Sequence, residues 1–176
     1  VFTDRQQCYK PRLSEFEDTK ASALGDYLPA KLGMDPEEKV VWACLPGDYA
    51  GDLIFFFENG NAARVPLAAY QTQSRRKKLT GAYSDKSPLA AVLWLKEEQD
   101  LAVAATDGRT VVFDSSLLAV KTTRTTQGVA VMSLKKGQIV ASASPLPETT
   151  IKRVARYRAK TLPAVGAILL GVDNPD

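Results

Sequence analysis

The chain has 176 residues, of which 45% are hydrophobic and 24% are charged, and its formal net charge is +3. These proportions indicate an ordinary soluble globular protein and exclude the fibrous and disordered classes. The chain contains no histidine, which excludes a Ser-His-Asp or Cys-His nucleophile and a His-ligated metal within it. It has no apolar run of the roughly 18 residues that span a bilayer and no signal segment. We therefore expect a cytoplasmic protein with no membrane partner.

Short apolar runs, joined in pairs by turn residues, recur along the chain. Residues 1–13 have this pattern with the first strand cut short. Asn59-Gly60 and Asp107-Gly108 tolerate the positive φ angles of a tight type I′ turn, so each predicts a junction between two antiparallel strands. The two complete hairpins comprise residues 53–57 with 62–67 and residues 101–105 with 110–113.

The last part of the chain is less regular. Ile139–Ala143 resembles an inner strand, and Thr150–Val154 is the predicted return strand, but Pro145-Leu146-Pro147 stands where the earlier hairpins have glycine turns. Terminal repeats are commonly atypical because they close or cap an array.

A recurrence of about fifty residues with one hairpin per repeat is typical of propeller-like proteins. The sequence therefore predicts an all-β domain built from antiparallel blades. Val1 lies within a strand pattern, so we expect the chain to be a fragment of a longer one. The approximate repeats of this single domain are 1–52, 53–100, 101–138 and 139–176.

No catalytic centre, cofactor site or metal site is expected within the chain. Cys8 and Cys44 lack a metal-ligating spacing. The acidic clusters at 15–18, 35–38 and 97–100 lie in loop-like stretches, which predicts solvated turns. The sequence also contains no glycine-rich phosphate loop.

The charge is unevenly distributed along the chain. Residues 1–70 contain 7 Lys and Arg against 11 Asp and Glu, whereas residues 71–176 contain 16 against 9. The basic clusters follow hairpins at related places in successive repeats, so we expect them along one side of a disc of blades, as in a phosphate-binding surface. Solvated loops are the simpler alternative. The clusters comprise Arg75–Lys78, Lys121 with Arg124, Lys135-Lys136, and Lys152, Arg153, Arg156, Arg158 and Lys160.

These clusters favour duplex nucleic acid over exposed bases. Few aromatic residues are interleaved with them, and single-strand binding normally uses a row of stacking rings. Tyr70, Tyr83 and Tyr157 flank the basic stretches. No recognition helix is evident, so binding without sequence preference is predicted.

Three segments, 57–70, 73–78 and 124–129, resemble the carboxy-terminal domain found in the DNA gyrase A protein and in its relative, the topoisomerase IV A protein. They share a hairpin that ends in Lys or Arg, a spacer, and then Arg and Gly-Val, and the resemblance covers essentially the whole chain. It implies an all-β, partial β-pinwheel, a disc whose blades exchange strands and whose basic rim binds and bends duplex DNA. It implies no catalytic residue here, because strand cleavage and ATP hydrolysis belong to other domains or to the partner protein.

The gyrase domain carries the signature Gln-Arg-Arg-Gly-Gly-Lys-Gly, which is tied to DNA wrapping. The corresponding segment, Gln73–Gly81, retains Gln, two Arg, Lys and the final Gly, but the central glycines are missing. This departure favours a protein similar to that of topoisomerase IV. The loop is also the longest and most basic of the chain, so we expect it to be the main DNA contact.

The sequence thus predicts the non-specific duplex-binding and bending module of a bacterial type IIA DNA topoisomerase, within its A protein, at the nucleoid. The intact enzyme would change DNA topology with ATP, and this protein would act there with a second copy of itself and with an ATPase protein. A propeller-like module that recruits a protein through its charged rim, and an enzyme site completed by further sequence, remain alternatives. The predicted DNA-binding residues are Arg64, Gln73, Arg75, Arg76, Lys77, Lys78, Lys121, Arg124, Lys152, Arg153, Arg156, Arg158 and Lys160.

Overall fold

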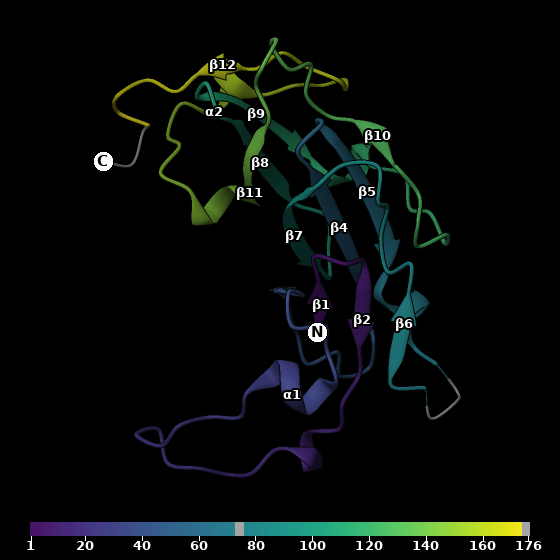
Figure 1. The fold of residues 1–176 in the computed structure, drawn as a ribbon. Helices are drawn as coiled ribbons and strands as arrows, with labels where there is room; N and C mark the ends of the chain where they lie inside the picture. Colours follow the sequence, from purple (N-terminus) through teal and green to yellow (C-terminus); the bar gives the residue numbers. More distant parts are fainter. Residues whose placement is uncertain (73–75, 174–176) are drawn as a thin grey trace.

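A computed structural model describes residues 1–72 and 76–173 of the chain. The described strands form three four-stranded antiparallel sheets, which we call the first, second and third blades and which follow one another across the molecule (Figure 1). The all-β prediction is confirmed. In the described part, no helix has the length and apolar character needed to cross a membrane.

Each blade has a hairpin at its centre and one further strand on either side. The first blade has the order β3 (Val40–Trp42), β1 (Phe2–Thr3), β2 (Gln7–Tyr9) and β6 (Lys78–Thr80). The second blade has the order β10 (Val129–Ala130), β5 (Asn61–Pro66), β4 (Asp52–Phe57) and β7 (Leu89–Leu95). The third blade has the order β11 (Val140–Pro145), β8 (Asp100–Ala105), β9 (Arg109–Asp114) and β12 (Ala167–Ile168).

The two hairpins that the glycine turns predicted are present as β4–β5 and β8–β9. The predicted type I′ turns are wrong, because Asn59 and Asp107 do not have the positive φ that this turn type requires. Gly60 and Gly108 have φ angles of +92° and +81°, the region that glycine adopts without a steric penalty. The chain's opening also forms a hairpin, β1–β2, where Gln6 takes the positive φ in place of a glycine. The remaining described elements are η1 (Leu13–Glu15), α1 (Leu28–Leu32), η2 (Leu67–Tyr70), η3 (Ser115–Leu117), η4 (Leu146–Glu148) and α2 (Val154–Tyr157).

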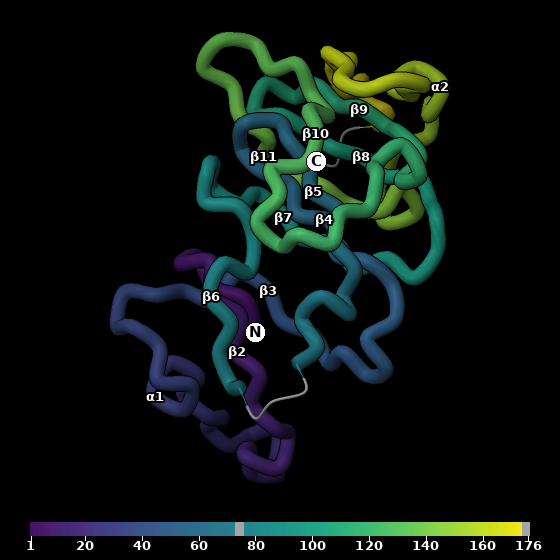
Figure 2. The backbone as a smooth tube through the Cα atoms, turned by 90° about the vertical axis from the view of Figure 1, so that its right-hand side faces the viewer, coloured from purple at the N-terminus to yellow at the C-terminus, as the bar shows by residue number. Residues whose placement is uncertain are grey.

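In each of the first two blades, one outer strand comes from a later part of the sequence than the other three strands. The first blade is completed by β6 only after the chain has formed the β4–β5 hairpin, and the second blade is completed by β10 only after the β8–β9 hairpin. Figure 2 shows β6 beside β2, although the two strands are far apart in sequence. The blades are therefore linked by exchanged strands.

The predicted return strand at Thr150–Val154 is wrong. Residues 150–153 have no regular structure, and Val154 begins α2. The carboxylate of Asp173 accepts hydrogen bonds from the N–H groups of Lys152 and Arg153, at 2.7 and 3.2 Å, so these groups are not free to form a strand ladder. The preceding run forms β11, which pairs with β8 and completes one side of the third blade.

The hydrophobic core holds the blades together through the two faces of β4. Leu53 and Phe55 pack in one cluster with residues of the first blade, whereas Ile54 packs in a second cluster with residues of the third. All three side chains are fully buried. In the first cluster, the rings of Phe55 and Tyr83 stack with centroids 5.4 Å apart. Such alternation follows from the period of two along a strand.

An acidic excursion, residues 10–39, connects β2 to β3 and extends away from the first blade at the bottom of Figure 1. It is anchored at its end by Glu38, whose buried carboxylate accepts hydrogen bonds from the hydroxyls of Thr3 and Tyr9. Leu24 and Tyr27 within it are 99% and 72% exposed. The excursion is thus tied to the blade while much of its length is solvated.

Replacing Gly128 by Ala tests the strand exchange, because Gly128 leads into β10. Its φ is +67°, and a Cβ there would lie 1.8 Å from the carbonyl oxygen of Ala62. We expect Gly128→Ala to lower the free energy of unfolding by about 3 kcal/mol or more. Gly108→Ala is the control, because Gly108 has φ +81° but open space around it, and it should cost about 1–2 kcal/mol. Equal losses in urea unfolding would contradict the close approach of the exchanged strand.

Candidate nucleic-acid interface

Five basic residues converge where the first and second blades meet, and we call them the basic edge: Lys10, Arg76, Lys77, Lys78 and Arg124. The pairing of β2 with β6 positions three of them, Lys10, Lys77 and Lys78. Lys78 lies on β6 opposite Tyr9 of β2, with its ammonium 5.3 Å from the centre of the Tyr9 ring. Beyond the strand, the N–H of Lys10 donates to the carbonyl of Lys77 at 2.7 Å. The β2–β6 pair therefore places Lys10 beside the predicted basic loop.

Arg124 reaches the same edge from a different part of the chain. The segment 121–128, which leads into β10, begins with a hydrogen bond from the N–H of Lys121 to the carbonyl of Arg64. The Arg124 guanidinium donates to the carbonyl of Ala69 at 3.1 Å and lies 6.0 Å from the centre of the Tyr70 ring. The fold thus brings together cations that are far apart in sequence.

Lys10 is a candidate site residue that the sequence-based set omitted. Its ammonium donates to the carbonyl of Tyr70 at 3.1 Å and to the hydroxyl of Thr72. Burial lowers its pKa, the proximity of Arg124 and Arg76 lowers it further, and Cys8 acts in the opposite sense. A repulsive group of cations of this kind is stabilised by a bound anion. The sequence feature that could have identified Lys10 is its position, because Lys10 occupies the place in its hairpin that Arg64 occupies in the next hairpin.

A basic cleft of about 820 Å³ opens beside this edge. Residues of the acidic excursion line one side of it, and Thr72, Arg76 and Lys77 line another. Its polar side chains are those of Lys10, Arg12, Ser14, Glu15, Tyr49, Thr72, Arg76 and Lys77. Arg12 is therefore a second basic residue that the sequence-based set omitted.

The loops that lead into the outer strands β10 and β12 begin alike. The N–H of Lys121 binds the carbonyl of Arg64, and the N–H of Ala159 binds the carbonyl of Val112, at 2.9 and 2.8 Å. Each loop ends at a glycine with positive φ, Gly128 or Gly166, where a Cβ would collide with the neighbouring strand. The two loops therefore occupy related places in successive blades, but their basic residues do not coincide, because Lys121 corresponds to Ala159 and Arg124 to Leu162.

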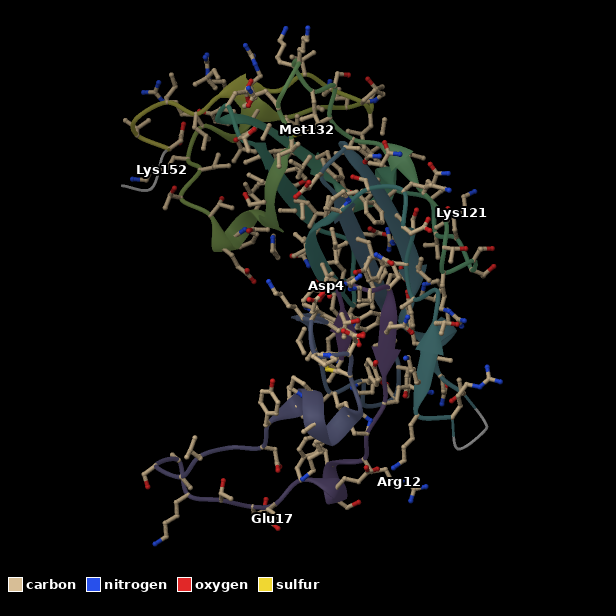
Figure 3. The ribbon with its side chains drawn as sticks, viewed as in Figure 1. Asp4, Arg12, Glu17, Lys121, Met132 and Lys152 are labelled. Atoms are coloured by element: carbon tan, nitrogen blue, oxygen red, sulfur yellow. The ribbon has the colours of Figure 1, made fainter. Side chains whose placement is uncertain are left out.

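A second basic group lies around α2 in the third blade. Lys152, Arg153, Arg156 and Lys160 are exposed. Asp173, itself fully buried, fixes this segment, and the hydrogen bonds from the Lys152 N–H and the Tyr157 hydroxyl hold the pKa of Asp173 below its usual range. Figure 3 shows Lys121 and Lys152 on opposite sides of the upper part of the molecule. The clusters are therefore divided between two regions of the surface rather than gathered in one.

Three predicted site residues are engaged in ion pairs, namely Arg64, Arg158 and Lys77, the last of which pairs with Glu15 at 3.0 Å. Arg64 is 7% exposed, and its guanidinium contacts Asp52 at 2.8 Å, Glu98 at 2.9 Å and the carbonyl of Ser115. Arg158 makes a two-point contact with Asp100 at 2.8 and 2.5 Å. Arg64 is thus enclosed within the protein and lies outside the basic edge. Gln73 and Arg75 lie outside the described residues.

The three tyrosines that flank the basic stretches do not offer rings for base stacking. Tyr70, Tyr83 and Tyr157 are buried. Their hydroxyls donate to Ala82, Thr3 and Asp173 respectively, and burial raises the pKa of Tyr83 to about 12. Within the described ranges, no group of three or more Cys, Asp or Glu side chains is placed to hold a metal ion.

Comparison with solved structures identifies the fold. The C-terminal domain of DNA topoisomerase IV matches with a TM-score of 0.81 and 22% identity, over 95% of this chain and 56% of that one. The DNA gyrase A C-terminal domain matches with a TM-score of 0.67 and 14% identity, over 94% of this chain and 57% of that one. The E. coli ParC C-terminal domain matches with a TM-score of 0.68 and 13% identity, over 97% of this chain and 75% of that one. The chain thus spans little more than half of the first two.

At these identities the likeness shows the fold, which is a partial β-pinwheel, as the sequence resemblance implied. No family model matches the chain, and no curated protein does.

Replacing Arg64 by Ala should destabilise the protein. Burial opposes the charge, but the bonds to Glu98 and Asp52 outweigh it and raise the Arg64 pKa. Breaking a buried pair costs about 3–5 kcal/mol, and partial exposure of Glu98 reduces this, so we expect a loss of about 2–4 kcal/mol in urea unfolding. Arg158→Ala, which breaks an exposed pair, should cost less than about 1 kcal/mol. If the Arg64→Ala protein were fully stable but bound DNA more weakly, Arg64 would be a DNA-contacting residue and not a structural one.

Proposed function

We propose that this chain is the duplex DNA-binding and bending module of a type IIA topoisomerase, within its A protein. The observation that carries the proposal is the convergence of five cations on one edge of a β-pinwheel. In the intact enzyme the module would act with an ATPase protein and with a second copy of its own chain, at the nucleoid in the cytoplasm. Strand passage and ATP hydrolysis would be performed elsewhere in that enzyme.

Binding would be driven by release of counterions from the DNA as Lys and Arg side chains neutralise phosphates. The basic edge supplies five such side chains, and the exposed hydroxyls of Thr122, Thr123 and Thr125 can hydrogen-bond to the backbone and fix its register. These contacts carry no base information. Affinity should therefore depend steeply on salt and weakly on sequence.

Bending follows from the placement of two basic groups on different blades. A duplex that contacts the basic edge and the group around α2 must follow the rim from the first blade to the third. Bending 20–30 base pairs by 40–90° costs on the order of 1–6 kcal/mol, which several phosphate contacts can offset. The second group would thus convert simple binding into curvature.

The helices of the described part do not suit sequence reading. They are α1 with 5 residues and α2 with 4, and a recognition helix needs more turns to place several side chains along a major groove. The degenerate signature in Gln73–Gly81 favours a topoisomerase IV-like module that bends DNA without wrapping it fully.

Recruitment of a protein partner is a second candidate function. The observation that favours it is the acidic excursion, which exposes Leu24 and Tyr27. Exposed apolar side chains among charges mark many protein contact sites. Weak salt dependence of duplex binding would favour this second candidate.

A duplex titration across salt concentrations tests the proposal. Changing Arg75, Arg76, Lys77 and Lys78 to Ala should lower the magnitude of the log-log salt slope by up to about 3.6, since each phosphate contact contributes roughly 0.9. The control changes four exposed lysines outside the interface, Lys20, Lys39, Lys86 and Lys96, and alters net charge equally. An unchanged slope in a folded quadruple variant would shift the DNA path to the group around α2.

Binding should require neither metal nor nucleotide, because the proposed contacts are direct ones from Lys, Arg and Thr side chains. We expect the same dissociation constant with and without a chelator, and with and without ATP, at matched ionic strength. Fluorescence anisotropy of a labelled duplex measures this. Loss of binding in chelator at constant ionic strength would point to a cation that bridges protein and phosphate.

A further inference from the structure

The basic cleft contains a carboxylate placed against its cations. Both oxygens of Glu15 accept hydrogen bonds from the Lys77 ammonium, each at 3.0 Å. Among the described residues that line the cleft, Glu15 is the acidic one, and it faces a lining that includes Lys10, Arg12 and Arg76. The carboxylate therefore occupies a position where an anionic ligand of the cleft would bind.

The local backbone, as well as Lys77, fixes Glu15 in this position. Glu15 ends the short helix η1, and its carboxylate also accepts a hydrogen bond from the N–H of Arg12 at 3.2 Å. The bonds from Lys77 and from Arg12 hold the pKa of Glu15 below its usual range. The side chain is thus ionised at neutral pH and presented to the cleft by its own turn.

We propose that Glu15 is an internal counterion that a backbone phosphate of duplex DNA displaces when it binds Lys77 in the basic cleft. This inference rests on the proposed function and names a residue that sets its strength. The exchange is physically accessible because the Lys77 and Glu15 side chains are 68% and 32% exposed. Exposed ion pairs are weak and exchange partners readily.

In the free protein Lys77 is therefore paired with Glu15, and this pair must break before Lys77 can contact DNA. Removing the carboxylate should free Lys77 and strengthen binding, whereas removing a carboxylate elsewhere on the excursion should have little effect. Glu17 provides the matched comparison, since it lies two residues away, is exposed and forms no ion pair within the described ranges. Figure 3 shows it on the excursion, away from the blades.

The first arm of the experiment compares Glu15→Gln with Glu17→Gln by anisotropy on one duplex. Both variants lose one negative charge. We expect Glu15→Gln to bind about two- to fivefold more tightly than the unchanged protein, in line with the modest strength of exposed pairs. Its salt slope should stay close to that of the unchanged protein, because Lys77 makes its phosphate contact in both complexes. Glu17→Gln should change affinity by less than about 1.5-fold. Equal gains from both variants would overturn the proposal.

The second arm repeats the substitution in a Lys77→Ala background. If Glu15 acts through Lys77, Glu15→Gln should there give no more than the Glu17→Gln effect. An undiminished gain would show general repulsion and would overturn the inference. Glu15→Asp keeps the charge but shortens the side chain, so it should fall between the parent and Glu15→Gln, and melting curves confirm folding of each variant. Failure of every folded protein, including the parent, to bind duplex would instead overturn the proposed function.

Discussion

Burial of alternate side chains of β4 on opposite faces is the interaction on which the remaining structure depends. Leu53 and Phe55 pack toward the first blade, whereas Ile54 packs toward the third, and all three are fully buried. One strand therefore contributes to two hydrophobic clusters and fixes how the blades are placed. Because each basic group is held by its blade, the separation between the basic edge and the group around α2 is set by this packing. The curvature that we propose for bound DNA would follow from it.

Strand exchange then determines which charges meet. The segment 121–128 can approach the first blade only because it returns to pair β10 with β5, and Gly128 permits the close passage over Ala62. This return brings Arg124 beside Tyr70, whose carbonyl also accepts the Lys10 ammonium. Cations that repel one another are thus held together by backbone pairing and by burial of neighbouring rings. The fold thus compensates for the repulsion between these cations, and we propose that a backbone phosphate relieves it.

Sequence patterns predicted what depends on neighbours along the chain. Turn chemistry at Gly60 and Gly108 sufficed for the two main hairpins, because a tight turn that needs one positive-φ residue is a local property. The exchanged strand β10 has two residues, which is too few for a periodic signal, so its pairing depends on tertiary contacts. Charge alone could not show that Arg64 is enclosed by Asp52 and Glu98, since its carboxylate partners come from separate strands and loops. The strand pattern at Thr150–Val154 was overridden by distant hydrogen bonds.

The acidic and basic parts of the sequence are not separated in the folded protein. The acidic first part and the basic second part would lie apart in a chain whose repeats were merely consecutive. Here β6 returns the first basic residues to the first blade, so Lys77 faces Glu15 and Lys78 lies over Tyr9. Net charge therefore says little about how this surface meets an anion. What matters is the local balance at the basic edge, where several cations share a cleft with a carboxylate whose position the backbone of Arg12 helps to fix. A fold that exchanges strands can thus place an acidic segment against its own basic surface, as the contact between Glu15 and Lys77 shows.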